Sequence, residues 1–344
     1  MGGTSSERDV SLATGLRVAE ALRARGHEVT AVDTTRGALT PGEEQAMLSS
    51  GVVKVAPPPQ QELARMSVEA LPRTANTLPT RRDTDVIFLG LHGGQGEDGT
   101  IQALLDLTGV PYTGSGHLAS ALAMDKDLSK RLFRAAGVPT ADWVMVRRRA
   151  GESAIERPPT SAIRALGMPV IVKPSKQGST VGLSIVKESS QLDTAIGAAF
   201  EFDDEVMIER FIPGREFTVG ILGDEALPVG EIIPKHEIYD YECKYTAGMA
   251  EEVFPARISV EEAERVQSYA RKAFEALKLR GYARIDFRLS SVDGEFYCLE
   301  ANTLPGMTQL SLIPQAAAAA GISFPELCDR IVQLALAGRE AEKG

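Results

Sequence analysis

The stretch YCLEANTLPG, residues 297–306, carries two oxygen-bearing side chains at the end of an apolar run. Glu300 and Asn302 are two residues apart, so in a strand they point to the same face. A buried carboxylate is costly unless it is paired or binds a metal ion. The pattern therefore indicates a metal site that needs a further ligand, and solvated polar residues at a strand end are the simpler alternative.

The segment YARIDFRLSSVDGEFYCLEAN supplies a candidate for the further ligand, because its two extended runs form a predicted hairpin around a DG turn. A two-residue loop would set Asp286 opposite Ala301 and place Glu300 on the other face. A three-residue loop, residues 292–294 with Gly294 left-handed, would set Asp286 opposite Glu300, since one step of register exchanges the faces. We predict the three-residue loop because it gathers the oxygen ligands.

Asp286, Glu300 and Asn302 would then be three hard oxygen donors that leave coordination positions for water and phosphate. Such a set suits Mg²⁺ at a nucleotide site. Arg284 lies two residues before Asp286 and shares its face, which places a fixed cation beside the metal.

The segment VIVKPSKQGSTVG indicates a phosphate-binding loop. An apolar strand that carries Lys173 leads into a loop with Gly178, Ser179, Thr180 and Gly182. Small residues let backbone N–H groups approach phosphate oxygens, and the lysine adds a charge. The order of residues is not that of a P-loop, and a polar hairpin is the alternative.

The glycines of LHGGQGEDG match the dinucleotide fingerprint at Gly94, Gly96 and Gly99. That fingerprint requires an acidic residue about 20 positions later, at the end of a second strand. The chain there reads GHLASALAMDK, which is predicted to be helical, so the dinucleotide interpretation fails. His92 ends the preceding apolar strand and still suggests a ligand site, with a packed core histidine as the alternative.

Two loops could complete a site. In GGTSSERDVS, small residues precede a helix and could cradle an anion, while Glu7 could pair with a substrate ammonium group. In YDYECKYTAGM, residues 239–249, aromatic residues surround Lys244 and suggest a mobile lid that brings a cation to phosphate. The alternatives are a loop with a helix cap and an exposed loop.

Composition limits the classes of function. The 344 residues predict two or three domains, and the 43% hydrophobic and 24% charged content is typical of a globular protein. A net charge of −10 argues against a nucleic-acid or membrane binder. The three cysteines, Cys243, Cys298 and Cys328, are far apart, as in reduced cytosolic proteins. Without a predicted membrane span or signal peptide, the chain is expected to be cytoplasmic.

The elements that position these residues follow from local patterns. Helices are predicted from Ser11 to Arg25, from Asp125 to Gly137, and from a capping box at Ser323 onward. Residues 85–92 are a continuous apolar run, as in a buried parallel strand, and residues 35–82 form a surface excursion.

Taken together, the motifs resemble the D-alanine–D-alanine ligases of the ATP-grasp superfamily. The resemblance covers nearly the whole chain and rests on GGTSSERDVS, LHGGQGEDG, PYTGSG, AMDK, VIVKPSKQGSTVG, IERF with REFTV, YDYECKY, ARIDF and LEANTLPGMTQLSL, in the family's order. It implies α/β and α+β structure in a three-domain ATP-grasp architecture. The domains would be an N-terminal Rossmann-like (pre-ATP-grasp) substrate domain, 1–124, a central subdomain, 125–210, and a C-terminal subdomain with the metal site and lid, 211–344.

The resemblance implies a role for each matching residue. The metal ligands Asp286, Glu300 and Asn302 would hold two Mg²⁺ ions, which Mn²⁺ could replace. ATP would be bound by Lys126, Lys173, Glu209, Arg210, Phe211, Ile212, Glu216 and Lys244. The first D-alanine would meet Glu7, Ser179, Tyr245 and His92, the oxyanion would meet Arg284 and Gly306, and the second D-alanine would meet Ser311 and Leu312.

The implied reaction joins two D-alanine molecules through an acyl phosphate made from ATP, for peptidoglycan synthesis, in a homodimer. Family members carry a hydrophobic strand before GGTSSER, whereas this sequence begins at Met1, so the first strand is expected to be absent. Thr180 and Ile238 also depart from the common serine and phenylalanine. The alternatives are a D-alanine–D-lactate or D-alanine–D-serine ligase, which Tyr245 disfavours, and an ATP-binding protein inactive in ligation.

Overall fold

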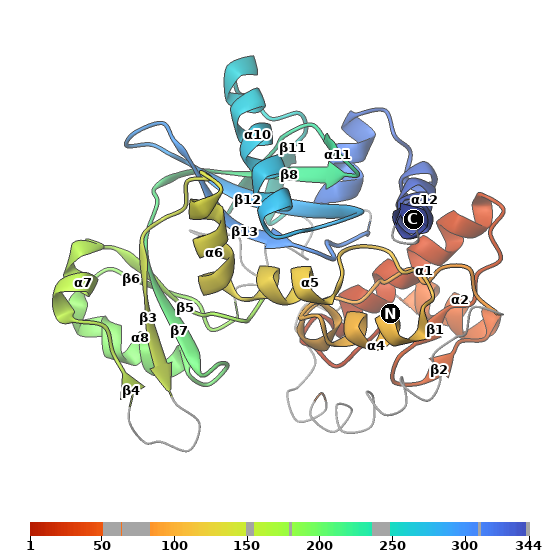
Figure 1. Cartoon of the computed structure of the whole chain (residues 1–344), viewed down its shortest axis with the longest axis horizontal. Coiled ribbons are helices and arrows are strands. Elements are labelled where there is room, and N and C mark those ends of the chain that lie inside the picture. Colours follow the sequence, from red (N-terminus) through yellow and green to blue (C-terminus); the bar gives the residue numbers. More distant parts are fainter. Residues whose placement is uncertain are drawn as a thin grey trace.

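The computed structural model describes residues 1–50, 63, 83–148, 155–178, 181–235, 248–308 and 311–341. Its elements form three groups: N-terminal helices, a small antiparallel sheet, and a larger antiparallel sheet between helices (Figure 1). The strand order is β4-β3-β7-β5-β6 in the small sheet and β11-β10-β8-β12-β13 in the larger one, where β9 also pairs with β8.

The N-terminal group is mainly helical. Its elements are α1 (Arg8–Ala24), β1 (Val32–Asp33), β2 (Gly37–Ala38), α2 (Pro41–Ser50), the 3-10 helix η1 (Gly94–Gly96), α4 (Thr100–Thr108) and α5 (His117–Met124). The predicted helix that begins near Ser11 is therefore confirmed, and it starts three residues earlier. At the start of the chain, the Met1 amino group donates to Val32 O (3.0 Å) and Thr34 N donates to Met1 O (3.1 Å).

The predicted parallel strand at residues 85–92 is wrong as a full strand. Among the residues that the structure describes, this segment forms a single parallel bridge, between Ile87 and Tyr112. Side chains replace the rest of the ladder: Ser11 Oγ donates to Gly90 O (2.5 Å) and Leu89 N donates to Thr113 Oγ1 (3.0 Å). These side chains satisfy buried peptide groups that a neighbouring strand would otherwise pair, so the extended segment stays buried without a regular ladder.

The central group is a five-stranded sheet. It contains β3 (Trp143–Arg148), β4 (Ile155–Glu156), β5 (Val170–Pro174), β6 (Ser184–Val186) and β7 (Glu205–Arg210), together with α7 (Thr160–Ala165), η2 (Ser189–Gln191) and α8 (Leu192–Ala199). The apolar side chains of α8 pack on β5 and β7. The apolar strand predicted before the glycine loop is confirmed as β5. The helix predicted from Asp125 to Gly137 is α6 (Lys126–Ala135). It begins where the Asp125 side chain accepts a hydrogen bond from Leu128 N (3.0 Å).

The C-terminal group is the larger sheet. It contains β8 (Gly214–Leu222), β9 (Glu225–Ala226), β10 (Gly230–Pro234), β11 (Ala250–Val253), β12 (Tyr282–Ser290) and β13 (Phe296–Asn302), together with α10 (Val260–Ala276), α11 (Leu312–Ala319) and α12 (Phe324–Ala341). Figure 1 shows α12 beside α1, at the right of the molecule. At the predicted capping box, Glu326 N donates to Ser323 Oγ (3.4 Å).

Alternation along β12 separates a core face from a polar face. Ala283, Ile285 and Phe287 pack in the core that includes α10. The residues between them, Arg284, Asp286 and Arg288, must therefore point the other way. That polar face is the one on which the candidate site is built.

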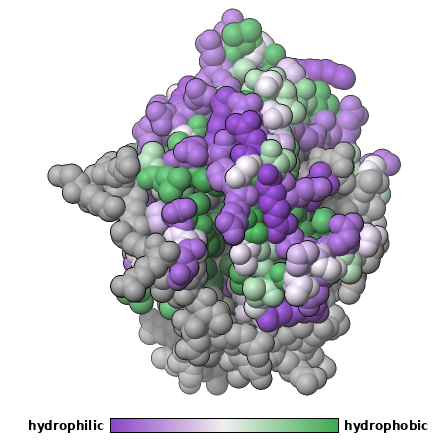
Figure 2. All heavy atoms as spheres, turned by 90° about the vertical axis from the view of Figure 1, so that its right-hand side faces the viewer, coloured by the Kyte–Doolittle hydropathy of each residue, from purple (hydrophilic) through white to green (hydrophobic). Residues whose placement is uncertain are grey.

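Among the described residues, no helix is long and apolar enough to cross a membrane. Figure 2 shows the face at the right of Figure 1, where hydrophilic side chains cover much of the coloured surface and hydrophobic ones lie between them in small groups.

Candidate active site

Asp286 and Glu300 are direct partners in the antiparallel pair β12–β13. The predicted pairing of Asp286 with Glu300 is therefore confirmed, but the three-residue loop predicted to cause it is wrong. Ser290 N donates to Glu295 O (2.9 Å), so four residues, 291–294, form the loop, with Gly294 left-handed at φ 69°. Such a loop alone would set Asp286 opposite Leu299 and turn Glu300 to the core face.

A β-bulge corrects the register. The ladder pairs Phe287 with Cys298 and Asp286 with Glu300, which leaves Leu299 as the extra residue. Cys298 and Ala301 both pack in the core with α10, so the two residues between them face the other way. Leu299 and Glu300 accordingly line the same cavity although they are adjacent in sequence.

The Asp286 carboxylate accepts hydrogen bonds from three neighbouring side chains. Thr218 Oγ1 donates to it at 2.8 Å, Asn302 Nδ2 at 2.9 Å, and the Arg284 guanidinium at 3.0 and 2.9 Å. Arg284 is also the ladder partner of Asn302. The four predicted side chains, Arg284, Asp286, Glu300 and Asn302, are thus gathered on one face. Within the described part of the chain, no cluster of three His, Cys, Asp or Glu side chains is placed to hold a metal, and the predicted set has an amide as its third member.

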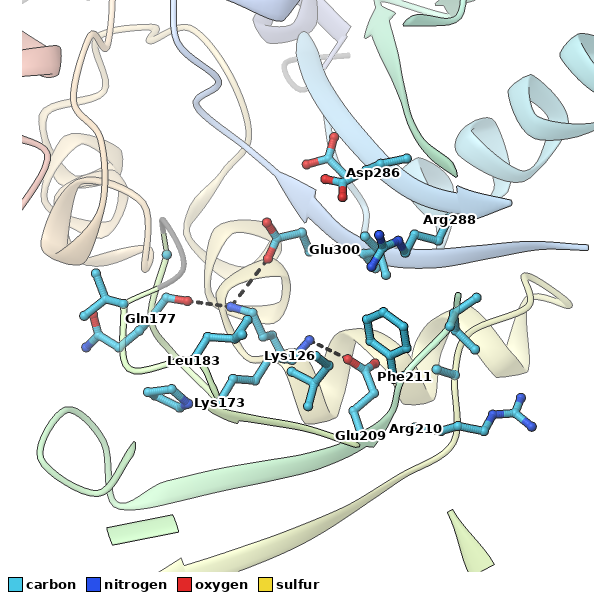
Figure 3. A pocket seen from close by; sticks show the side chains of 18 residues that line it. Lys126, Lys173, Gln177, Leu183, Glu209, Arg210, Phe211, Asp286, Arg288 and Glu300 are labelled. Carbon is cyan, nitrogen blue, oxygen red and sulfur yellow. Dashed lines mark hydrogen bonds and ion pairs between the residues drawn. The ribbon is translucent and has the colours of Figure 1, made fainter. Parts of the chain in front are cut away.

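Lys126 joins this face to the glycine loop. It lies at the start of α6, and its Nζ donates to Gln177 O (2.6 Å) and lies 3.6 Å from Glu300 Oε2 (Figure 3). One cation from α6 therefore contacts both the loop after β5 and the acidic end of β13.

Glu209 lies between two lysines on the opposite wall. Its Oε2 accepts from Lys173 Nζ (2.6 Å), and its Oε1 accepts from the fully buried Lys130. Burial alone would raise the pKa of the Glu209 carboxyl, but the two ammonium groups outweigh it and lower that pKa to about 2. Burial lowers the pKa of Lys130, and Glu209 opposes that effect.

The cavity between these walls is lined by both apolar and charged side chains. The predicted nucleotide residues Glu209, Arg210, Phe211, Ile212 and Glu216 all line it, and Ile171, Val181, Leu183 and Leu299 are among its apolar residues. Arg288, which sequence reasoning missed, lines the same cavity with its guanidinium 5.2 Å from the Phe211 ring centroid. Its position two residues after Asp286 on the polar face was the available signal.

Glu7 lies beside both glycine-rich loops. A Cβ atom added to Gly93 would lie 2.8 Å from Glu7 Oε2, and one added to Gly178 would lie 3.5 Å from the same oxygen. Glycines at these positions therefore leave the space that the Glu7 carboxylate occupies, and Gly93 also has a positive φ of 66°. Glu7, which belongs to the N-terminal group, thus lies beside the loop that follows Lys173.

His92 and Glu97 contact the loop after β13. His92 Nδ1 lies 2.8 Å from Leu304 O, and Glu97 accepts from Leu304 N (3.1 Å) and Gly93 N (2.7 Å). Burial and the neighbouring Glu7 raise the pKa of Glu97 to about 7. Sequence reasoning missed Glu97 although it belongs to LHGGQGEDG, because nothing local shows that it reaches Leu304.

Gly306 and Ser311 lie together in the same loop. A side chain on Gly306 would begin 2.7 Å from Ser311 Oγ, so only glycine fits without a shift. Ser311 Oγ accepts a hydrogen bond from Thr308 N (2.9 Å). Ser311 is the residue before α11, which begins at the buried Leu312. The predicted residues Ser179, Lys244 and Tyr245, together with Thr180 and Ile238, lie outside the described residues.

Comparisons with known proteins agree along the chain. A family model described as "D-ala D-ala ligase N-terminus" matches residues 1–115, and one described as "D-ala D-ala ligase C-terminus" matches residues 132–333. Among curated relatives, the D-alanine–D-alanine ligase of Geobacter sulfurreducens is 43% identical over 96% of this chain and 91% of the relative. Those of Geotalea uraniireducens and Carboxydothermus hydrogenoformans are 42% and 38% identical over 97% and 98% of this chain, and 94% and 97% of theirs.

Solved structures show the same likeness. The crystal structure of D-alanine–D-alanine ligase from Bacillus anthracis has a TM-score of 0.76 and 34% identity, and covers 99% of this chain and 97% of that one. The same enzyme complexed with ATP has a TM-score of 0.75 and 32% identity, with the same coverage. The mixed α/β ATP-grasp fold predicted from the motifs is confirmed, and the chain belongs to the D-alanine–D-alanine ligase family.

Proposed function

We propose that this chain ligates two molecules of D-alanine to D-alanyl-D-alanine, with conversion of ATP to ADP and phosphate, as a step of peptidoglycan precursor synthesis. The observation that carries the proposal is the placement of Lys126 between the glycine loop and Glu300, within one cavity that also holds Lys173 and Asp286. The names of the relatives and the ATP complex of the Bacillus anthracis enzyme support it.

ATP is proposed to lie in the cavity between the sheets. Lys126 and Lys173 bind its phosphates, residues 209–212 meet the adenine, and Glu216 binds the ribose. Lys244 and the loop at Ser179 close over the phosphates. The apolar and the charged side chains that line the cavity suit the two chemically different halves of a nucleotide.

Asp286, Glu300 and Asn302 are proposed to hold two Mg²⁺ ions, which Mn²⁺ could replace. Their carboxylate and amide groups are hard oxygen donors on one strand face, and so fit such ions. When bound, the ions neutralise phosphate charge during phosphoryl transfer.

The first chemical step joins two anions. A carboxylate oxygen of the first D-alanine attacks the γ-phosphorus, the bond from that phosphorus to the ADP oxygen breaks, and an acyl phosphate forms. Lys126 and Lys173 reduce the charge repulsion during this transfer. Glu7 binds the ammonium group of the first D-alanine, with Ser179, Tyr245 and His92 on the same side.

The second step makes the peptide bond. The neutral amine of the second D-alanine attacks the acyl carbon, the carbon–oxygen bond breaks, and phosphate leaves with the proton that the amine nitrogen loses. Arg284 and the Gly306 amide stabilise the oxyanion of the tetrahedral intermediate, while Ser311 and Leu312 bind the carboxylate of the second D-alanine. Exclusion of water by the lid, residues 239–249, protects the acyl phosphate from hydrolysis.

The organisation of the chain is part of the proposal. Residues 1–124 form the substrate domain, 125–210 the central ATP-grasp subdomain, and 211–344 the C-terminal subdomain. The active form is a homodimer. It acts in the cytoplasm, in line with the free thiols of Cys298 and Cys328. Light scattering tests the dimer, since a single mass of about 37 kDa, from the chain mass of 36.8 kDa, would contradict it.

The test combines the protein, Mg·ATP and D-alanine, and measures dipeptide and phosphate together. We expect equal amounts of both products. Phosphate without dipeptide would show uncoupled hydrolysis and point to a fault at Glu7, and neither product would leave the protein as a nucleotide-binding module. Replacing half of the D-alanine with D-lactate or D-serine decides the second substrate, because each mixed product has its own mass.

A further inference from the structure

The loop after β13 is held by three segments of the N-terminal group. Leu304 N donates to Glu97 Oε1 (3.1 Å), Leu304 O lies 2.8 Å from His92 Nδ1, and Met307 N donates to Thr14 Oγ1 (3.3 Å). Thr14 comes from α1, His92 from the extended segment 85–92, and Glu97 from the turn before α4. The loop that carries Gly306 is therefore positioned across the boundary between two parts of the chain.

Thr14 and His92 also contact each other. Thr14 Oγ1 lies 2.8 Å from His92 Nε2, and the two residues are 1% and 5% exposed. Water can therefore not readily replace any bond of this group, and each donor needs an acceptor inside the protein. That requirement decides where the protons lie.

The proton positions follow from the acceptors. A carbonyl oxygen can only accept, so His92 Nδ1 must carry the hydrogen that faces Leu304 O. Thr14 Oγ1 accepts from Met307 N, and its own hydrogen then points to His92 Nε2, which accepts it as the ring's lone-pair nitrogen. The opposite tautomer would set two lone pairs against each other at 2.8 Å, between Nδ1 and Leu304 O.

The doubly protonated ring is disfavoured at this site. Burial lowers the pKa of His92, Glu7 and the Leu304 carbonyl oppose this effect, and the Met1 amino group and Arg284 add to it. The neutral ring with hydrogen on Nδ1 thus satisfies the contacts of His92 with Leu304 and Thr14 without a buried charge.

We propose that Thr14 is a positioning residue: its hydroxyl holds His92 in the Nδ1–H tautomer and, through Met307 N, fixes the loop whose Gly306 amide faces the oxyanion. The inference rests on the proposed function, because the oxyanion role of Gly306 belongs to that proposal. Pro305 has no N–H, so the bonds at Leu304 and Met307 are the ones that orient the intervening peptide groups.

The effect on the reaction follows from geometry. An oxyanion donor must lie at about 2.7–3.1 Å from the developing charge, and loss of one such donor lowers kcat by about 100- to 1000-fold. Loss of the Thr14 hydroxyl shifts the Gly306 amide without removing it, so we expect a smaller decrease in kcat. Binding of ATP should not change, because the ATP cavity is lined by other residues.

Thr14→Val and Thr14→Ser test the inference in the full-length protein. Valine keeps the shape and removes the hydroxyl, whereas serine keeps the hydroxyl. We expect kcat for dipeptide formation to fall about 10- to 100-fold in Thr14→Val, with KM for ATP unchanged, and to stay within about threefold in Thr14→Ser. Thermal unfolding of both variants checks that each is folded. A kcat of Thr14→Val within about twofold of the wild type would overturn the inference.

A second measurement does not depend on ligation. Long-range ¹H–¹⁵N correlation spectra of the wild type report which ring nitrogen of each histidine carries hydrogen, and the signal missing in His92→Gln identifies His92. We expect the neutral Nδ1–H form, and an Nε2–H or doubly protonated ring would overturn the inference. If the wild type makes no dipeptide, the proposed function fails, and comparison of the ring spectra of the wild type and Thr14→Val then decides whether Thr14 holds the tautomer.

Discussion

Asp286 and Glu300 face each other across β12 and β13 because Leu299 bulges out of the ladder, and the length of the turn does not bring this about. The four-residue loop and the bulge each change the register by one step, and the second change compensates the first. As a result Leu299 and Glu300 face one cavity, with an apolar and an acidic side chain side by side. The bulge thereby places the apolar wall of the nucleotide site next to its predicted metal ligand.

Two single-residue deletions distinguish this arrangement from a regular strand. Deletion of Leu299 removes the extra residue and leaves Asp286 opposite Glu300, so metal dependence should be retained while ATP binding weakens about 10-fold through loss of an apolar contact. Deletion of Ala301 forces either Glu300 or Asn302 into its buried place in the core. That variant should lose activity and unfold at a lower temperature.

Magnesium titrations of dipeptide formation and thermal unfolding compare the two deletions. If both variants behaved alike, the bulge would not be what determines the face of Glu300.

Replacing Glu300 with Gln keeps the shape of the side chain and removes its charge. We expect the Mg²⁺ concentration for half-maximal activity to rise about 10- to 100-fold, because an amide is a poorer ligand than a carboxylate. Glu295→Gln is the control, since Glu295 lies just before the same strand but away from the cavity. An unchanged magnesium titration in Glu300→Gln would remove Glu300 from the metal site.

Local patterns predicted much of this site and could not predict its remainder. Alternation in YARIDFRLS places Arg284 and Asp286 on one face, and the apolar strand before the glycine loop places Lys173. The bulge at Leu299 could not be predicted, because it depends on which residues of β13 fill the core against α10. The contacts of Glu97 and Thr14 with the loop after β13 join residues more than 200 positions apart, and no local pattern reports them.

Lys173→Ala should abolish ligation and leave the protein folded. Glu209 remains paired with Lys130 in this variant, so the buried carboxylate keeps a counterion. We expect kcat/KM to fall at least about 100-fold, as for other groups that stabilise charge in a transition state. The control is Lys176→Ala, because the Lys176 side chain is 42% exposed and lies in the loop that follows β5. Unchanged ligation in Lys173→Ala would exclude Lys173 from phosphate binding.

Glu209 should make stability depend on acid pH. The pKa of its carboxyl is lowered from 4.5 to about 2, which corresponds to about 3 kcal/mol at about 1.36 kcal/mol per pH unit. Because the folded pKa is the lower one, this contribution is fully present above pH 4.5 and is lost as pH falls toward 2. Glu209→Gln lacks it at every pH and leaves two buried lysines without their anion.

Urea unfolding of the wild type and of Glu209→Gln at pH 7, 4.5 and 2.5 measures the difference between them. We expect the wild type to be more stable at pH 7 and the difference to shrink by about 2 kcal/mol between pH 4.5 and 2.5, because the carboxyl of the unfolded chain takes up a proton there while the folded one stays largely charged. Glu201→Gln, at an exposed position, is the control and should follow the wild type throughout. A difference that stayed constant from pH 7 to 2.5 would mean that the two lysines do not hold the Glu209 carboxylate in its charged form.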